Sequence, residues 1–143
     1  MGKKRIVKKG ESEETGGAKT SGGKVSRKKM EAGILHVLAT YNNTILLLTD
    51  MKGNAICSSS SGALGFRGAK KGTPFAASKV GETLALKAST LGLKEIEVVV
   101  KGVGSGRESS IRSFTSKGFT ISRIKDATPM PFNGVKPPKP RRV

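Results

Sequence analysis

The 143-residue sequence has little of what disulfide-linked proteins, zinc proteins and base-stacking proteins need. It contains one cysteine, one histidine and no tryptophan, and aromatic residues make up only 4% of it. A single cysteine, Cys57, excludes an internal disulfide and a cysteine-rich zinc site, and it fits a reducing compartment. The shortage of aromatic residues argues against a platform on which successive bases stack.

Long apolar runs are also missing. The longest uninterrupted ones, such as "ILLL" at 45–48, have the length of a strand, whereas a membrane span needs about 18 residues. The start "MGKKRI" does not suit myristoylation, and no apolar segment resembles a signal peptide. We therefore expect a soluble cytoplasmic protein without a membrane partner.

Acidic residues are scarce relative to basic ones. The 10 acids face 27 lysines and arginines, which gives a formal net charge of +17. A small soluble chain with this charge repels itself strongly unless a polyanion neutralises it. Nucleic acid is therefore the leading candidate partner.

The chain divides into three zones. Residues 1–31 carry ten cations and four acids with almost nothing to bury, so we predict a disordered basic arm. Residues 32–127 have alternating strand and helix patterns, which predict an α/β domain. Residues 128–143, "TPMPFNGVKPPKPRRV", hold five of the six prolines and four cations, which predicts an extended, basic tail.

Three short β-rich runs open the predicted domain: "GILHVLAT", "TILLLTD" and "NAICSSSS". The intervening "YNN" and "MKGN" contain the asparagines and glycine that tight turns require, so we expect an antiparallel meander. A helix is then predicted to begin with Thr73 as N-cap and Pro74 at its first position, and to stop at Gly92.

The second half alternates. "KEIEVVV" predicts a fourth strand, "SGRESSIRSFTSKG" predicts a short helix with a capping box of Ser105 and Glu108, and "FTISRIKD" predicts a fifth strand. The order βββαβαβ predicts a mixed five-stranded sheet with two main helices. Ribonuclease H-like proteins have this order, and we expect that topology.

A glycine-rich cationic loop precedes the first helix. In "GFRGAKKGTPFAASK", residues 65–79, Arg67, Lys70 and Lys71 lead directly to Thr73. Glycines let a backbone approach a ligand, and a helix amino end favours an anion, so the loop predicts a phosphate site. The alternative is a solvated loop whose cations contact nothing, and the net charge favours phosphate.

The segment "KGVGSGRES", residues 101–109, repeats this arrangement of strand end, glycines and helix start. A dinucleotide site would also place an acid about 20 residues later, where Asp126 stands, but its fingerprint is Gly-x-Gly-x-x-Gly rather than Gly-x-Gly-x-Gly. We therefore favour a second contact with a polynucleotide backbone and expect no cofactor.

Catalytic groups are not apparent. Two-metal phosphoryl chemistry on this fold needs a carboxylate on the first strand, and residues 32–40 contain none. Glu82, Glu95 and Glu97 are interpreted as surface positions, and His36 and Cys57 as structural residues. We expect neither a metal site nor catalytic residues.

The phenylalanines are assigned by their place in the pattern. We expect Phe75, Phe114 and Phe119 in the core. Phe66 in the loop and Phe132 in the tail are the two that we consider for stacking on a base.

Several ordered motifs carry a resemblance to a known family: "YNNT", "TD" followed by "GNA", "GFRG" with "KKGTPFAA", "VKG" leading to "GRES", and the tail "TPMPFNGVKPPKPRRV". Over residues 32–143 the chain resembles the bacterial form of the universal small-subunit ribosomal protein S eleven family. It departs from that pattern in the second glycine loop, at Val103 and Ser105, and in the tail, at Phe132, Val135 and Pro140.

The resemblance implies a non-enzymatic structural constituent of the small ribosomal subunit. It implies binding to the central domain of the small-subunit ribosomal RNA, in the platform near the exit site and the upstream messenger RNA path. The implied neighbours are small-subunit proteins seven, eighteen and twenty-one, with initiation factor three close by and no homo-oligomer. The residues expected to line RNA are Asn42, Asn43, Arg67, Lys70, Lys71, Thr73, Lys101, Gly104, Ser105, Arg107, Asn133, Lys136, Lys139, Arg141 and Arg142.

Two rival functions stay open. One is a small nucleotide-dependent or nuclease-like enzyme that uses the Gly102–Gly106 loop and the glutamates. The other is a free-standing single-strand binder outside the ribosome. Independently of these, the Asn133-Gly134 step is a candidate for isoaspartate formation, because glycine exposes the asparagine to attack by the backbone.

Overall fold

Tight turns join the first three strands, so each strand pairs with the one before it. The computed structural model describes residues 29–142, in which β1 (Ala32–Ala39), β2 (Thr44–Thr49) and β3 (Ala55–Ser60) pair as antiparallel neighbours. The carboxylate of Asp50 stabilises the second turn, since it accepts hydrogen bonds from the backbone N–H groups of Lys52 and Asn54 at 2.9 Å each. Gly53, with φ of 90°, takes the left-handed conformation that the turn needs.

Two parallel strands complete the sheet. β4 (Glu95–Lys101) pairs with β1, and β5 (Thr120–Asp126) pairs with β4, which gives the order β3-β2-β1-β4-β5. The helices α1 (Pro74–Ser89) and α2 (Gly106–Thr115) supply the crossovers. The predicted mixed five-stranded sheet with two main helices is therefore confirmed, while the ribonuclease H-like label stays a prediction.

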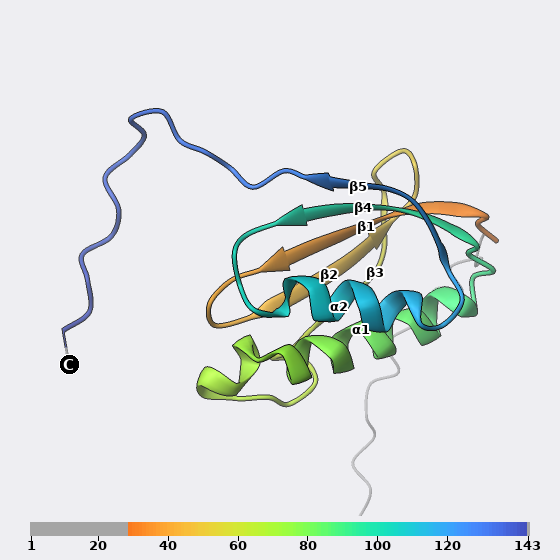
Figure 1. Cartoon of the computed structure of the whole chain (residues 1–143), viewed down its shortest axis with the longest axis horizontal. Helices are drawn as coiled ribbons and strands as arrows, with labels where there is room; N and C mark the ends of the chain where they lie inside the picture. Colours follow the sequence, from red (N-terminus) through yellow and green to blue (C-terminus); the bar gives the residue numbers. More distant parts are fainter. Residues whose placement is uncertain (1–28, 143) are drawn as a thin grey trace, which may run out of the picture.

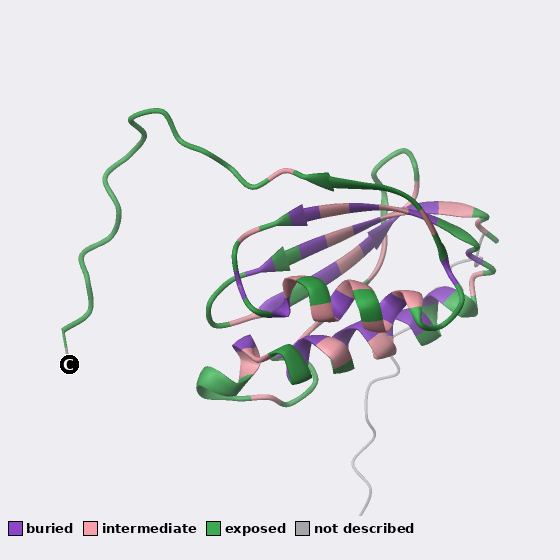
Figure 2. Ribbon diagram, in the orientation of Figure 1, coloured by how far each residue is buried: buried purple, intermediate pink, exposed green. Residues whose placement is uncertain are grey.

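The core lies between one face of the sheet and the two helices (Figure 2). Alternate residues of β1 and β4 point into it, among them Leu35, Val37 and Val98, and meet Leu84 of α1. The helices pack closely because α1 has Gly81 at the contact, where a Cβ would collide with the side chain of Ser113 and the backbone of Ser110. The ring of Phe114 stacks on that of Phe119 at 4.7 Å.

The prediction that three phenylalanines lie in the core is confirmed for two of them and wrong for the third. Phe114 and Phe119 are buried, but Phe75 is 64% exposed. Phe75 is the second residue of α1, and at this position the helix turns that side chain to solvent, while Ala76 and Ala77 take the buried positions.

The described structure begins before the predicted domain boundary. Met30 packs against the core and its N–H donates to the carbonyl of Leu91 at 3.0 Å. The rest of the predicted disordered arm, residues 1–28, lies outside the described residues. At the other end, residues 128–142 form neither helix nor strand and lead away from the sheet, as Figure 1 shows.

Four strands end at the same edge of the sheet. β1, β4 and β5 are parallel, and β3 runs in their direction because it follows two antiparallel reversals. The 40–43 turn, the 61–73 loop, the 102–105 loop and the tail all leave from this edge (Figure 1). We call it the carboxyl edge, and the sequence-predicted site residues lie at it or in the tail that leaves it.

Candidate nucleic-acid interface

The 61–73 loop presents its cations on a fixed framework. The N–H of Ser61 donates to the carbonyl of Thr44 at 3.0 Å, and the N–H of Phe66 donates to the carbonyl of Ser61 at 3.2 Å. Arg67 and Lys70 are exposed, and Lys71 is half-buried. The sequence predicted only a loop here, whereas residues Gly68–Gly72 form a short 3-10 helix, η1.

Thr73 connects this loop to α1. Its hydroxyl donates to the carbonyl of Lys70 at 2.7 Å and accepts from the N–H of Ala76 at 3.3 Å. The predicted N-cap is therefore confirmed, with Pro74 at the first helical position. The cap fixes the cationic loop relative to the helix amino end.

Ser105 joins the two glycine-rich loops. Its hydroxyl donates to the carbonyl of Gly72 at 2.6 Å, 33 residues away in the chain. The predicted capping box with Glu108 is wrong, because this hydroxyl makes no cap hydrogen bond and Ser105 has helical dihedrals, φ of −66° and ψ of −17°. The two loops, interpreted separately from the sequence, form one unit.

Close backbone packing explains three glycines of this unit. A Cβ on Gly102 would collide with the carbonyl of Ala39, one on Gly104 with the carbonyl of Thr40, and one on Gly72 with the carbonyl of Tyr41. In the second loop, packing against the protein's own backbone therefore accounts for the glycines at 102 and 104, while contact of this loop with a ligand stays a prediction. By contrast, a Cβ on Gly65 or Gly68 would meet no described atom within 4 Å.

The two turn asparagines have different surroundings. The side-chain oxygen of Asn43 accepts from the hydroxyl of Ser61, and its backbone N–H and carbonyl bond to the hydroxyl of Thr40, both at 3.1 Å. Asn42 is exposed beside Tyr41, which is 82% exposed. Asn43 therefore holds the turn, and Asn42 faces solvent.

Arg107 is engaged within the protein. Its guanidinium donates to the carbonyl of Gly102 at 2.8 Å and to the carboxylate of Asp126 at 2.6 Å. Asp126 also accepts from the hydroxyl and the N–H of Thr128, and the hydrogen bond from the hydroxyl, followed by that from Arg107, lowers the pKa of Asp126 well below its usual range. In the dinucleotide alternative the carboxylate of Asp126 would bind a ribose, but its two oxygens already accept hydrogen bonds from Arg107 and Thr128.

The remaining predicted residues lie just before the 102–105 loop or in the tail. Lys101 is exposed at the end of β4. The tail residues are exposed on the extended segment: Asn133, Lys136, Lys139, Arg141 and Arg142. The structure thus brings together the loop residues and places the tail residues on a segment that starts at the same edge.

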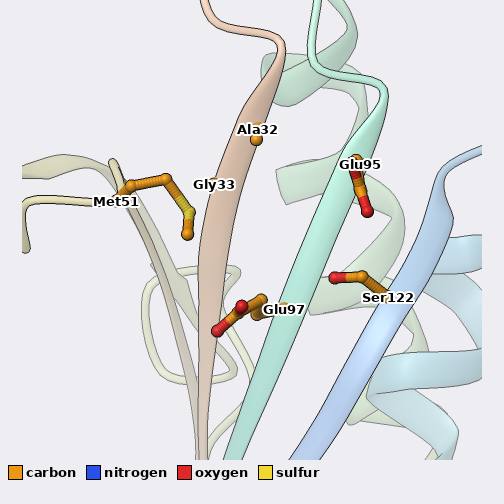
Figure 3. Close-up of a pocket in the computed structure, with 6 residues that line it drawn as sticks. All are labelled: Ala32, Gly33, Met51, Glu95, Glu97 and Ser122. Carbon is orange, nitrogen blue, oxygen red and sulfur yellow. The ribbon is translucent and has the colours of Figure 1, made fainter.

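Two glutamates of the enzyme alternative lie in the half of β4 that is away from the carboxyl edge, whereas Glu82 lies in α1. Glu95 and Glu97 line a depression with Ala32, Gly33, Met51 and Ser122 (Figure 3). Glu97 is paired with Arg123 at 2.9 Å. Within residues 29–142, no three His, Cys, Asp or Glu side chains are placed to hold a metal ion, and no helix there is long and apolar enough to cross a membrane.

The sequence did not assign three residues of the carboxyl edge to the candidate site. Tyr41 and Phe75 present exposed rings beside the cationic loop, and Thr128 fixes the start of the tail through Asp126 and the N–H of Gly102. An aromatic residue next to the turn asparagines was the available signal for Tyr41. No local pattern distinguishes Phe75 from a core residue.

Exposed cations lie on interlocked loops at one edge of an α/β domain, a charge distribution that is typical of nucleic-acid-binding proteins. The family model described as Ribosomal protein S11 matches residues 33–142. The chain therefore belongs to the ribosomal protein S11 family, as its motifs predicted, and it is a structural ribosomal protein of the small subunit that acts in translation.

Proposed function

We propose that this protein binds the central domain of the small-subunit ribosomal RNA and helps form the platform of the subunit, near the exit site and the upstream messenger RNA path. Its proposed neighbours are small-subunit proteins seven, eighteen and twenty-one, and its proposed location is the ribosome of the cytoplasm. The support is membership of the family together with the cationic carboxyl edge.

The hydrogen bond from Ser105 to Gly72 is the observation that carries this proposal. It fixes the two loops in one arrangement before RNA binds, so that little ordering of their backbones opposes association. The cations of the first loop then form a preorganised phosphate surface, with affinity that depends on counterion release.

The tail contributes differently. Its cations, Lys136, Lys139, Arg141 and Arg142, lie on an extended segment without helix or strand. The prolines limit the conformations that the segment loses on binding, while its length lets it follow an RNA strand away from the domain. We propose that loops and tail contact separate stretches of the same RNA.

The proposed RNA-lining residues have unequal roles. Arg67, Lys70 and Asn42 are exposed and free to contact RNA directly. Arg107, with about a third of its side chain exposed, has its charge balanced by Asp126, so its proposed role is to hold the 102–105 loop in place. The full proposed set remains Asn42, Asn43, Arg67, Lys70, Lys71, Thr73, Lys101, Gly104, Ser105, Arg107, Asn133, Lys136, Lys139, Arg141 and Arg142.

Sedimentation of cell lysate tests the proposal. The wild-type protein is expected to travel with small subunits and to be nearly absent from the soluble top fractions. Replacing Arg67, Lys70 and Lys71 together by alanine is expected to move protein to the top. A matched variant with alanine at Lys87, Lys94 and Lys117, exposed cations near the opposite edge, loses the same charge and is expected to stay with the subunits. Wild-type protein in the top fractions, bound to other RNA, would support a free-standing binder instead.

A further inference from the structure

Phe66 and Phe75 form an aromatic pair on the surface at the start of α1. Their ring centroids are 6.1 Å apart and their planes meet at 83°, an edge-to-face contact. Phe75 is 64% exposed, whereas Phe66, in the 61–73 loop, is half-buried. A large exposed ring supported by a second ring is typical of a contact surface rather than of a core.

The rings are held by the same framework that holds the cations. Phe66 is anchored by the hydrogen bond from its N–H to Ser61, and Phe75 lies in the first turn of a helix that Thr73 caps. The backbone positions that carry the two rings are therefore set before any ligand binds. Preorganisation of this kind reduces the entropy that binding costs.

Positive charge surrounds the pair. Arg67 follows Phe66 directly, Lys70 lies in the same loop, and the amine of Lys79 lies 5.8 Å from the centroid of the Phe75 ring. Glu82 is the one acid in residues 61–82, and it is already bonded to Lys79 at 3.0 Å. An occupant that suits this site combines a flat apolar face with negative charge beside it.

We propose that Phe75, supported by Phe66, stacks on an unpaired base of the bound RNA while Arg67 and Lys70 contact the phosphates beside that base. This inference rests on the proposed RNA-binding function. A nucleotide has both the flat face and the adjacent negative charge, whereas an apolar protein side chain would complement the ring but not the positive charge beside it. The base must be unpaired and unstacked, because only then is its face free.

The absence of tryptophan from the chain makes a direct test possible. Phe75→Trp places a single tryptophan at the site, and stacking on a base is expected to quench its emission when a central-domain transcript is added. Leu86→Trp is the matched control, since Leu86 is exposed to a similar degree, 59%, and lies near the other end of the same helix. Its emission is expected to stay unchanged.

The affinities of variants without tryptophan complete the test. Phe75→Leu keeps an apolar side chain but no ring, and it is expected to weaken transcript binding roughly 5- to 100-fold. The dependence of affinity on salt is expected to stay as in the wild type, because no phosphate contact is removed. Phe75→Tyr keeps the ring and is expected to bind like the wild type.

The outcomes separate this inference from the proposed function. Salt-dependent wild-type binding, with Phe75→Leu binding equally well or Phe75→Trp unquenched, overturns the stacking inference alone. An emission change that appears only after other platform proteins are added identifies a protein occupant and also overturns it. Wild-type binding that does not depend on salt contradicts the phosphate contacts, both those of the proposed function and those of this inference, while quenching of Phe75→Trp in that case still supports stacking.

Discussion

The guanidinium of Arg107 lies 2.6 Å from the carboxylate of Asp126 and joins the first turn of α2 to the last residue of β5. Asp126 in turn accepts from Thr128, whose hydroxyl accepts from the N–H of Gly102 at 3.2 Å. Beside them, the N–H of Ala127 donates to the carbonyl of Val100 at 2.9 Å, which extends pairing one residue past β5. These contacts fix the direction in which the tail leaves the domain.

We expect Asp126→Asn to loosen the start of the tail. The amide loses the charge that attracts Arg107, and its NH2 group cannot accept the hydrogen bonds that both carboxylate oxygens now accept. Faster amide hydrogen exchange at Gly102 and Ala127 is the expected result. Glu97→Gln, which removes the ion pair between Glu97 of β4 and Arg123 of β5, serves as the control. It should leave the exchange rates of both amides unchanged. Equal exchange in Asp126→Asn and the wild type would contradict this role.

The interlocked loops predict that some glycines cannot be replaced. Gly72→Ala and Gly104→Ala each drive a methyl group into a backbone carbonyl, that of Tyr41 or Thr40, and we expect each to lower the free energy of unfolding by about 1–3 kcal/mol. Gly62→Ala is the control, because its Cβ would lie 3.8 Å from the side chain of Lys71, an ordinary contact. Urea unfolding measures all three, and equal midpoints would show that the loops are not packed as described.

The sheet was predictable because its signals are local. Alternating apolar residues and turn asparagines mark the first three strands, and Thr73 with Pro74 marks the start of α1. The cations of the site also follow from a local pattern, since the loop sequence places them directly before a helix. The resemblance of the motifs added the family.

The failures concern contacts between segments far apart in the chain. Ser105 has the spacing of a capping box, but the carbonyl of Gly72 takes its hydroxyl, and nothing near Ser105 in the sequence shows that carbonyl. From the sequence, a glycine at position 104 could serve either the approach of a ligand or close packing within the protein. Only the fold shows that the backbone of Thr40 lies against it. Phe75 has the composition of a core residue and its exposure depends on where α1 meets the sheet.

His36 predicts a pH dependence of stability. It lies half-buried on the sheet face opposite the helices, with Thr49 Oγ1 3.2 Å from its Nε2, and burial followed by the charge of Lys101 lowers its pKa below the ordinary 6.5. In the pH range just below 6.5 the unfolded chain therefore binds more protons than the folded one, so the free energy of unfolding falls as the pH drops through that range.

Urea unfolding at pH 7.5 and 5.5 checks this dependence. We expect the wild type to be less stable at pH 5.5, and His36→Gln to lose most of the difference, since carboxylates titrate mainly at lower pH. Lys101→Gln should reduce the difference only in part, because burial is the larger cause. A pH dependence that is the same in His36→Gln and the wild type would contradict the assignment to His36.

Asn133 is expected to form isoaspartate. It is exposed and has a positive φ of 53°. The next residue, Gly134, has no side chain to shield its backbone nitrogen, which can therefore attack the side-chain carbonyl of Asn133. The attack releases ammonia and gives a succinimide, which water opens to isoaspartate. Peptide mass spectrometry with an isomer-sensitive separation should detect the product in aged protein, and much less of it in Gly134→Ala. Finding only unmodified asparagine would reject the proposal.

The salt dependence of binding to a central-domain transcript tests the central claim, that fixed cations at the carboxyl edge bind RNA phosphates. The logarithm of the affinity is predicted to fall with the logarithm of salt concentration, by about 0.7 for each phosphate contacted on a single strand. Replacing Arg67, Lys70 and Lys71 by alanine is then predicted to reduce the slope by about 2, whereas the Lys87, Lys94 and Lys117 variant keeps the wild-type slope. A flat wild-type response, or an unchanged slope in the loop variant, would contradict the claim.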